Sequence, residues 1–379
     1  MEDSIQVRPV VTRKERYEFV RFPWKVYKSD PNWVPPLIAD MMDMLDPAKG
    51  EFYKRAEIAL FMAYRGNELA GTIAAFVDRN VVEHTGKKIG GFGFFEVLED
   101  YEVARHLLDA ACEWLRSRGM EMMRGPTNFG ENDQPGVLVA GADCPPVMLE
   151  AHTPLYYKDF LERYGMEKDH DLYAWRAFRE QIGDELGKIP SELLEVADVG
   201  RRAVNVTIRK LDMKRWDEEV KTAHFLFNAT LNHLPDFVPM PEEDFISMAN
   251  RLKLFIDPDL ALFAEAASKP IGFCIAFPDI NRVLIHLNGR LFPFNWLRIR
   301  GLVRKVDVIT FKLMGVLEEY RRRGIDALLY LETLKAFYQK GYAWLDGSVT
   351  SEYNPAVNLI AYRLGAERYK HYRIYKMVL

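Results

Sequence analysis

The sequence between residues 316 and 329 reads Val316-Leu317-Glu318-Glu319-Tyr320-Arg321-Arg322-Arg323-Gly324-Ile325-Asp326-Ala327-Leu328-Leu329. Residues 308–316 before it are β-branched and apolar, which predicts a strand, and residues 326–340 carry apolar side chains at helical spacing. A tight loop between a strand and a helix brings several free backbone N–H groups together, and the three arginines add charge that suits a polyphosphate. We therefore predict a phosphate cradle here, with an ordinary solvated turn as the alternative.

The size and composition of the chain limit the classes of protein to which it can belong. With 379 residues it exceeds what one hydrophobic core normally serves, so two domains are expected. The net charge of −4 gives no reason to expect a nucleic acid as partner. The acidic N-terminus lacks an apolar signal region, and no run approaches the roughly 20 apolar residues of a membrane span. We therefore expect a cytoplasmic protein.

The three cysteines are Cys112, Cys144 and Cys274, which lie far apart in the sequence. Cys112 and Cys274 fall in apolar runs, which predicts buried thiols. Their odd number and wide spacing favour neither a disulfide framework nor a metal site, so no metal is expected.

One order of predicted elements occurs twice along the chain. Residues 60–80 have a counterpart in residues 262–281, and residues 97–101 have one in residues 316–320. A predicted helix follows each of the latter, and Leu161-Glu162-Arg163-Tyr164-Gly165 then corresponds to Ala361-Tyr362-Arg363-Leu364-Gly365. Because the repeat is about 200 residues long, we interpret it as two copies of one α/β domain rather than as a solenoid.

The two copies differ at the arginine loop. The first copy is three residues shorter between its tyrosine, Tyr101, and the glycine that ends its helix, Gly119. It also has Tyr101-Glu102-Val103-Ala104 where the second copy has residues 320–327. This asymmetry favours a phosphate site in the second copy over a solvated turn, and it predicts that the first copy has none.

These residues resemble the GCN5-related N-acetyltransferase (GNAT) superfamily, whose signature loop is Arg/Gln-x-x-Gly-x-Gly/Ala after a strand and at the start of a helix. The run Arg321-Arg322-Arg323-Gly324-Ile325 fits that loop, and Asp326 stands where Gly or Ala is usual. Because an aspartate near a helix N-terminus is a good cap, we expect Asp326 to cap the helix. Asn354 and Gly365 also fit the family pattern, and Ala361 falls at the position of the family's tyrosine.

The resemblance implies two tandem GNAT-like α/β domains, each with a mixed, mostly antiparallel sheet flanked by helices. We expect a degenerate domain at residues 1–178, a connecting segment at 179–203, and a domain with the acyl-CoA site at 204–379.

The resemblance also implies transfer of an acyl group, expected to be acetyl, from coenzyme A to an amine by direct attack. Acetyl-CoA or another acyl-CoA is then the co-substrate, and a small-molecule or lipid-like amine is the acceptor. Backbone N–H groups near Val316 and Leu317 are expected to hold the pantetheine and polarise the thioester carbonyl. The residues expected to hold the rest of coenzyme A are Arg321, Arg322, Arg323, Gly324, Ile325, Asp326, Ala327 and Asn354.

The general base and acid are less determined by the sequence. Glu318 and Glu319 recur as Glu99 and Asp100 in the first copy, which favours a structural role in a turn. His286 lies in an apolar run and is expected to be a hydrogen-bonded histidine in a strand. Glu352 therefore remains as the candidate base. Tyr362, one position after the family's tyrosine, is the candidate acid, with Tyr372, Tyr375 and water as alternatives.

Two segments of the second copy are candidates for the acceptor side. Residues 228–245 form an aromatic and proline-rich loop between predicted helices, which lines the acceptor site in the resembled family or is a surface connection. Residues 288–305 are basic and aromatic, and they make the second copy longer than the first. This stretch suits an acyl chain, a peripheral contact with a membrane surface, or packing against the other copy.

Two alternatives to an acetyltransferase stay open. The long basic and aromatic stretch favours a long-chain acyl or lipid-directed transferase. Asp326 and the absent tyrosine favour a non-catalytic acyl-CoA-binding or regulatory protein. The oligomeric state does not follow from the sequence.

Overall fold

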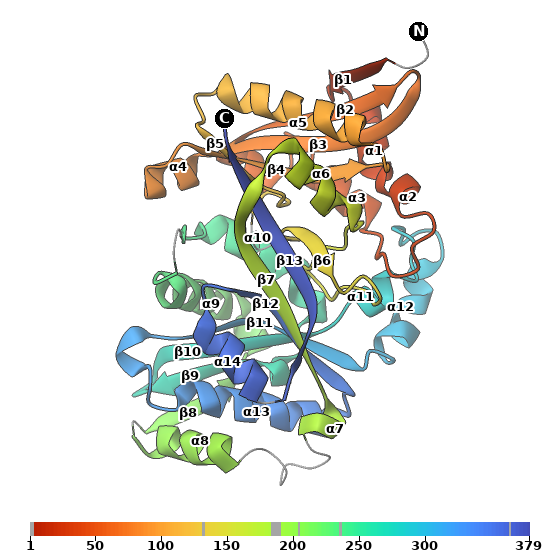
Figure 1. The fold of residues 1–379 in the computed structure, drawn as a ribbon. Coiled ribbons are helices and arrows are strands. Elements are labelled where there is room, and N and C mark those ends of the chain that lie inside the picture. The colour runs from red at the N-terminus through yellow and green to blue at the C-terminus, as the bar shows by residue number, and fades with distance from the viewer. Residues whose placement is uncertain (1–3, 131–132, 183–190, 204, 235–236, 364) are drawn as a thin grey trace. The chain divides into compact units, whose positions relative to one another are not determined.

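The computed structural model describes residues 4–130, 133–182, 191–203, 205–234, 237–363 and 365–379 (Figure 1). By its internal contacts the chain divides into two compact units. Unit 1 comprises residues 1–173, 281–301 and 370–379, and unit 2 comprises residues 174–280 and 302–369. Two segments from within the expected second domain, 281–301 and 370–379, thus pack with the first half of the chain.

Unit 1 contains one twisted sheet with the strand order β1-β2-β3-β4-β5-β13, in which β4 and β5 pair in parallel and the other pairs that the structure describes are antiparallel. Its elements are β1 (Ile5–Pro9), α1 (Arg13–Arg21), α2 (Pro23–Val26), α3 (Ile38–Met44), η1 (Glu51–Lys54), β2 (Ala56–Arg65), β3 (Glu68–Asp78), α4 (Arg79–Thr85), β4 (Ile89–Val97), α5 (Tyr101–Arg116), β5 (Met122–Gly125), β6 (Val137–Ala140), α6 (Tyr156–Tyr164) and α11 (Asn281–Leu284). The strands β7 (Glu167–Phe178) and β13 (Glu367–Val378) and the helix α12 (Asn295–Val303) each cross a unit boundary.

Each face of the unit 1 sheet carries its own core, because side chains alternate between the two faces of a strand. One core packs α5 against the sheet through residues such as Val103, Leu107 and Leu115, all of them fully buried. The other places Phe19 and Leu45 of the first helices against Met62 and Phe94.

Unit 2 repeats this plan with the strand order β7-β12-β11-β10-β9-β8, and β11 and β12 form its parallel pair. Its elements are α7 (Arg179–Ile182), α8 (Ser191–Ala203), β8 (Val206–Lys210), η3 (Met213–Arg215), α9 (Trp216–Leu231), α10 (Glu242–Leu252), η4 (Lys253–Phe255), η5 (Pro258–Leu260), β9 (Ala261–Ala266), β10 (Lys269–Pro278), β11 (Val308–Val316), η6 (Glu318–Tyr320), α13 (Ile325–Lys340), β12 (Trp344–Ser351) and α14 (Pro355–Arg363). Helix α13 packs on β8–β10 and on α8, whereas α9 contacts β10 and β11.

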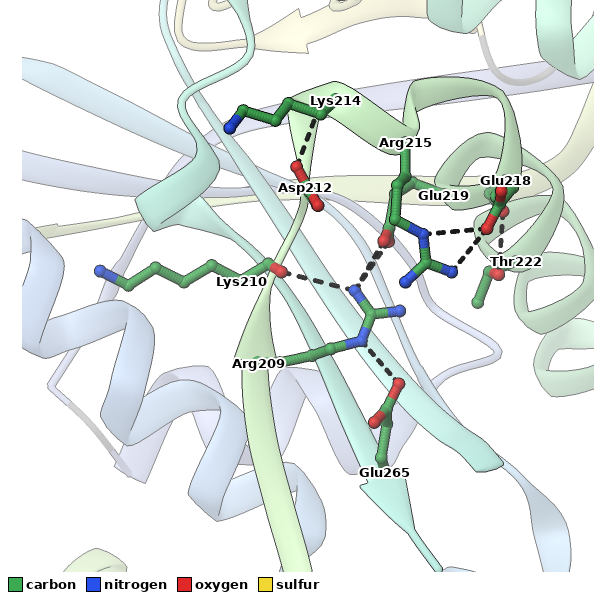
Figure 2. A network of polar contacts seen from close by, with 9 residues as sticks. All are labelled: Arg209, Lys210, Asp212, Lys214, Arg215, Glu218, Glu219, Thr222 and Glu265. Atoms are coloured by element: carbon green, nitrogen blue, oxygen red, sulfur yellow. Dashed lines mark hydrogen bonds and ion pairs between the residues drawn. The ribbon is translucent and has the colours of Figure 1, made fainter. Parts of the chain in front are cut away.

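Arg209 links helix α9 to the sheet of unit 2 through an ion pair (Figure 2). Arg209 on β8 donates from Nη1 to both carboxylate oxygens of Glu219 on α9, each at 2.8 Å, and from Nε to Glu265 on β9 at 2.6 Å. Its guanidinium also lies over the ring of Phe263, 4.6 Å from the centroid. Glu219 is only 1% exposed, so Arg209 supplies the charge that its buried carboxylate requires.

Most elements expected from the sequence are present. The strand expected at residues 308–316 is β11, the hairpin around Gly66 is β2–β3, and Gly165 ends α6 in the left-handed conformation. The mixed α/β fold class is confirmed. Cys112 and Cys274 are buried thiols, as expected. His286 was expected in a strand and is not: it follows the short helix α11 and is exposed.

Of the helices that the structure describes, none combines the length and the hydropathy needed to cross a bilayer. The described residues likewise contain no group of three or more His, Cys, Asp or Glu side chains arranged to hold a metal ion.

We predict that Arg209→Met lowers the free energy of unfolding by about 3 kcal/mol, because it leaves the Glu219 carboxylate buried without its ion pair. Urea denaturation followed by circular dichroism measures the change. The matched control is Arg215→Met, since the pair of Arg215 with Glu218 is exposed on both sides and contributes less than about 1 kcal/mol. Equal effects of the two substitutions would contradict the anchoring role of Arg209.

Candidate functional site

The strands β11 and β12 separate partway along their length. Their parallel pairing runs from Val308 with Trp344 to Phe311 with Gly347, although β11 continues to Val316 and β12 to Ser351. A β-bulge lies at the point of separation: on the other edge of β11, Phe311 pairs with Ala276 and Leu313 with Ile275, which leaves Lys312 unmatched. Because a bulge bends its strand and increases its twist, it turns β11 away from β12.

The separation leaves backbone groups of β11 without a neighbouring strand. The Leu317 N–H donates to the Ile271 carbonyl at 2.9 Å, so it faces the β10 side. Since N–H groups alternate between the two edges of a strand, the Val316 N–H points to the other edge, where β12 has moved away. Of the two N–H groups expected to hold a thioester, the geometry thus favours that of Val316.

The loop after β11 ends in a helix N-terminus without a side-chain cap. Gly324 is the N-cap residue of α13 in the left-handed conformation, with φ of 76°, and the first helical bond runs from the Leu328 N–H to its carbonyl. The N–H groups of Ile325, Asp326 and Ala327 therefore have no intrahelical partner. The expectation that Asp326 caps the helix is wrong, because it lies in the first turn, one position past Ile325.

The three arginines of the loop have different roles. Arg321 is partly buried and structural: Nε donates to the Val316 carbonyl at 3.0 Å and Nη2 to the Thr230 carbonyl at 2.7 Å. Arg322 and Arg323 are exposed, and their side chains are the ones available to an anion. Sequence spacing gave no means of separating these roles.

Helix α8 covers one side of this loop. A Cβ atom added at Gly324 would lie 2.1 Å from the Val196 carbonyl oxygen, and one added at Gly200 would lie 2.5 Å from the Gly324 carbonyl oxygen. Close packing and a left-handed backbone thus both require glycine at position 324. A substitution there would displace α8, so it would not report on anion binding alone.

The loop before α13 also meets the segment between α9 and α10, for which the sequence left open an acceptor-site loop or a surface connection. His233, at the start of that segment, lies with Nδ1 3.3 Å from Arg321 Nη2. Thr230 lies directly over β11, since a Cβ atom at Gly315 would come within 2.0 Å of its hydroxyl oxygen. Pro235 and Asp236 of the expected segment lie outside the described residues.

A buried polar cluster lies where the strands separate, and the sequence reasoning missed it. The Asp346 carboxylate accepts hydrogen bonds from the hydroxyls of Thr310 and Ser348, each at 2.5 Å, and of Tyr369 at 2.9 Å. Lys312, on the bulge, donates to the Ser348 hydroxyl at 2.9 Å and lies 4.0 Å from Asp346.

Complete burial raises the pKa of Asp346 above its usual range, against the lowering effect of Lys312 and of the hydroxyl donors. A lysine inside the apolar run 308–316 was the sequence signal for this cluster.

The other expected site residues lie just before α14 or on it. Asn354 follows the turn after β12, its N–H donates to the Ser351 carbonyl at 2.9 Å, and its Oδ1 accepts from the Val357 N–H at 3.5 Å. Glu352 is partly exposed in the same turn. Tyr362 is 71% exposed on α14. The roles expected for Glu352 and Tyr362 stay predictions.

Unit 1 has the same strand separation, and its own side chains fill it. Parallel pairing of β4 with β5 ends at Gly91 and Arg124. Beyond it the Thr127 N–H donates to the Phe92 carbonyl at 2.9 Å, and the Phe94 N–H donates to Asn128 Oδ1 at 3.0 Å.

Two further backbone groups of β4, both of Val97, are also satisfied from within unit 1. The N–H of Val97, the counterpart of Val316, donates to the Tyr157 hydroxyl at 2.8 Å. The Val97 carbonyl accepts from the Tyr156 hydroxyl at 2.7 Å. The position that would hold a thioester in unit 2 is therefore occupied by tyrosine hydroxyls in unit 1.

The N-terminus of α5, the helix that follows β4, is also capped by a side chain of unit 1. Asp100 is the N-cap residue of α5, and its carboxylate accepts from the N–H groups of Glu102 at 3.1 Å and Val103 at 3.4 Å. Arg65 pairs with the same carboxylate at 2.7 Å. The N-terminus of α5 is therefore capped by a carboxylate of the chain itself.

Glu96, at the counterpart of Gly315, adds a titratable group to the closed site of unit 1. Its carboxylate accepts from the Tyr157 hydroxyl at 2.9 Å. Burial raises the pKa of Glu96 to about 7, although this hydrogen bond lowers it.

The architecture matches solved structures of acyltransferases along the whole chain. A tandem GNAT protein from the clavulanic acid biosynthesis pathway aligns with a TM-score of 0.59 and 12% identity, over 99% of this chain and 98% of that one. A GCN5-related N-acetyltransferase from Sphaerobacter thermophilus aligns with a TM-score of 0.52 and 13% identity, over 99% and 95%. At this identity the likeness concerns the fold.

Two proteins are similar in sequence over nearly their whole length. The bacterial ceramide synthase of Caulobacter vibrioides is 33% identical over 99% of this chain and 98% of its own length. Protein YghO of Escherichia coli is 32% identical over 98% and 94%. The chain belongs to their family, and its fold is that of GNAT proteins. No family model matches the chain. One of these two relatives is named as a ceramide synthase, which is an acyltransferase.

We predict that the stability of unit 1 falls as Glu96 ionises. Its pKa is raised from 4.5 to about 7 in the folded state, so its contribution is fully present below pH 4.5 and is lost as the pH rises through 7. Because the Glu96 side chain keeps some exposure to solvent, which screens its charge, we expect a loss of about 2 kcal/mol in the free energy of unfolding.

Glu96→Gln tests this, because the amide does not ionise. The stability difference between Glu96→Gln and the natural chain should grow in favour of the variant between about pH 4.5 and 8 in urea denaturation. Glu99→Gln, at the exposed neighbouring carboxylate, is the control. A difference that is independent of pH would contradict the raised pKa.

Proposed function

We propose that the chain is an N-acyltransferase that moves a fatty acyl group from a coenzyme A thioester to the primary amine of a long-chain amino alcohol. The observation that carries this proposal is the 33% identity with a bacterial ceramide synthase over 99% of the chain. A ceramide is, by its chemistry, a long-chain amino alcohol with a fatty acyl group on its nitrogen. The sequence alone favoured acetyl as the acyl group, and the relative's name favours the longer one.

Unit 2 supplies a suitable site for the thioester substrate. The N–H groups of Ile325, Asp326 and Ala327, together with the exposed Arg322 and Arg323, suit the diphosphate of coenzyme A. We place the extended pantetheine beside the edge of β11 that is no longer paired with β12. The Val316 N–H then donates to the thioester carbonyl oxygen, where negative charge develops during attack.

The chemistry needs a neutral amine next to a polarised carbonyl. The amine nitrogen attacks the carbonyl carbon, a C–N bond forms, the C–S bond breaks, and the thiolate leaves with the electron pair. One proton of the amine must be removed, and the thiolate takes one proton on release.

The buried cluster offers a route for the amine's proton. We propose that the amine passes it to the Ser348 hydroxyl, which passes its own proton to Asp346. The support is the 2.5 Å hydrogen bond between these groups and the raised pKa of Asp346, which makes that carboxylate a better base. Lys312 holds the Ser348 oxygen from the other side at 2.9 Å.

A binding protein without turnover is the second candidate, favoured by Ala361 at the position of the family's tyrosine. One experiment separates the candidates. The full chain is incubated in mild detergent with acetyl-, octanoyl- or palmitoyl-CoA and either ethanolamine or sphinganine, and thiol release and amide product are measured. We expect amide from palmitoyl-CoA and sphinganine. Turnover only with acetyl-CoA and ethanolamine, or binding without turnover, would overturn the proposal.

We predict that Arg322→Glu with Arg323→Glu weakens palmitoyl-CoA binding at least about tenfold, because two charge-assisted contacts to the diphosphate are lost. Both side chains are exposed, so the fold should be retained. Calorimetry measures the dissociation constant. Arg13→Glu with Lys14→Glu, at exposed positions of α1, makes the same change in net charge as a control. Equal affinities of the two double variants would contradict the site.

We predict that Ser348→Ala lowers kcat about 100-fold and leaves KM for the acyl donor within about twofold, because it removes the proton route and not the donor site. Steady-state kinetics on the pair of substrates that reacts best measures both. Thr350→Ala, on the same strand, is the control. An unchanged kcat for Ser348→Ala would exclude the relay.

A further inference from the structure

Residues 290–305, the insertion segment, combine positive charge with large apolar side chains. The sequence has no aspartate or glutamate between Asp279 and Asp307. The basic residues of the insertion segment are Arg290, Arg298, Arg300, Arg304 and Lys305. A concentration of positive charge in a chain with a net charge of −4 implies a partner that is negatively charged.

The two residues just before the insertion segment, Asn288 and Gly289, are fixed to other parts of unit 1. The Trp24 indole N–H donates to Asn288 Oδ1 at 2.6 Å, and the Ile38 N–H donates to the Gly289 carbonyl at 3.0 Å. A Cβ atom at Gly289 would lie 2.5 Å from the Trp24 ring. The segment therefore projects from a tightly packed base.

The insertion segment is also held by its own polar contacts. The Asn295 side-chain amide donates to the carbonyls of Leu287 at 3.1 Å and Arg290 at 2.8 Å. The Trp296 indole N–H donates to the Pro293 carbonyl at 3.1 Å. Because the turn is ordered before it meets any partner, binding would cost little conformational entropy.

Its apolar side chains point into solvent. Phe292 is 75% exposed, Phe294 72%, Trp296 52% and Leu297 61%. None of the residues of α12 (light blue in Figure 1), all of which the structure describes, is buried. Neighbouring large apolar residues with this exposure mark an interaction surface rather than scattered surface hydrophobics.

We propose that the insertion segment docks the protein on the surface of an anionic lipid bilayer. Aromatic and leucine side chains next to arginines are the composition of helices that lie in the membrane interface, with the rings at the headgroup level and the guanidinium groups on lipid phosphates. Five basic residues with no acidic residue between them in the sequence disfavour a second copy of the same surface, because like charges would face each other. The docking goes beyond the acyl transfer proposed above and does not depend on it.

The test is flotation of the full chain with vesicles of phosphatidylethanolamine and phosphatidylglycerol, with phosphatidylcholine vesicles alongside. We expect binding to the anionic vesicles at least about tenfold tighter than to the neutral ones, and weaker in high salt. The triple variant Phe292→Ser, Phe294→Ser, Trp296→Ser and the double variant Arg298→Glu, Arg300→Glu should each lose at least about tenfold.

Controls separate this surface from general stickiness and from the chemistry. Phe225→Ser with Leu254→Ser removes exposed apolar side chains elsewhere and should leave vesicle binding unchanged. Acyl transfer in detergent should be the same in all variants. Vesicle binding by the triple variant equal to that of the natural chain, or no binding of the natural chain, would overturn the docking. The docking would also be overturned if the natural chain did not bind vesicles but formed a concentration-dependent dimer that the triple variant abolishes. That result would favour a second copy of the chain as the partner.

Discussion

The β-bulge at Lys312 is the constraint on which the site of unit 2 depends. Up to Phe311 the strand β11 is held by hydrogen bonds on both edges, and beyond the bulge only the edge toward β10 is paired. The free edge of β11, the cluster around Asp346 and the uncapped start of α13 all follow within a few residues of that point. Local twist in one strand thus brings together the groups that we propose for binding the thioester and for taking the proton of the amine.

Both units share the strand separation and the helix that follows it, but this arrangement alone does not make a binding site. Both have the parallel pair that ends early, and both continue into a helix. In unit 1 the free groups are satisfied from within, by Asn128, by the hydroxyls of Tyr156 and Tyr157, and by Asp100 at the helix start. For the corresponding groups of unit 2 we propose a bound ligand as the partner. We interpret unit 1 as a scaffold that has closed its own copy of the site.

The sequence predicted the features that depend on neighbours along the chain. Residues 308–316, the loop with its arginines and the following helix were predictable because strand, turn and helix signals are local. The role of Arg321 was not, because its partner Thr230 lies on another helix. The cluster of Lys312 with Asp346 could not be predicted either, because it depends on which strands lie side by side. The same holds for the hydrogen bond from the Val97 N–H to the Tyr157 hydroxyl, which joins residues far apart in the sequence. The prediction that His286 lies in a strand was wrong because a short apolar run suits a strand and a helical turn equally.

Hydrogen–deuterium exchange of the full chain, with and without palmitoyl-CoA, tests most directly whether unit 2 alone holds the open site. Bound ligand should slow exchange in residues 312–328, since the free N–H groups of Val316 and of the first turn of α13 then gain partners. Exchange in residues 93–103 should stay the same, because the chain already satisfies those groups. Slower exchange in residues 93–103 with no change in 312–328 would contradict this assignment.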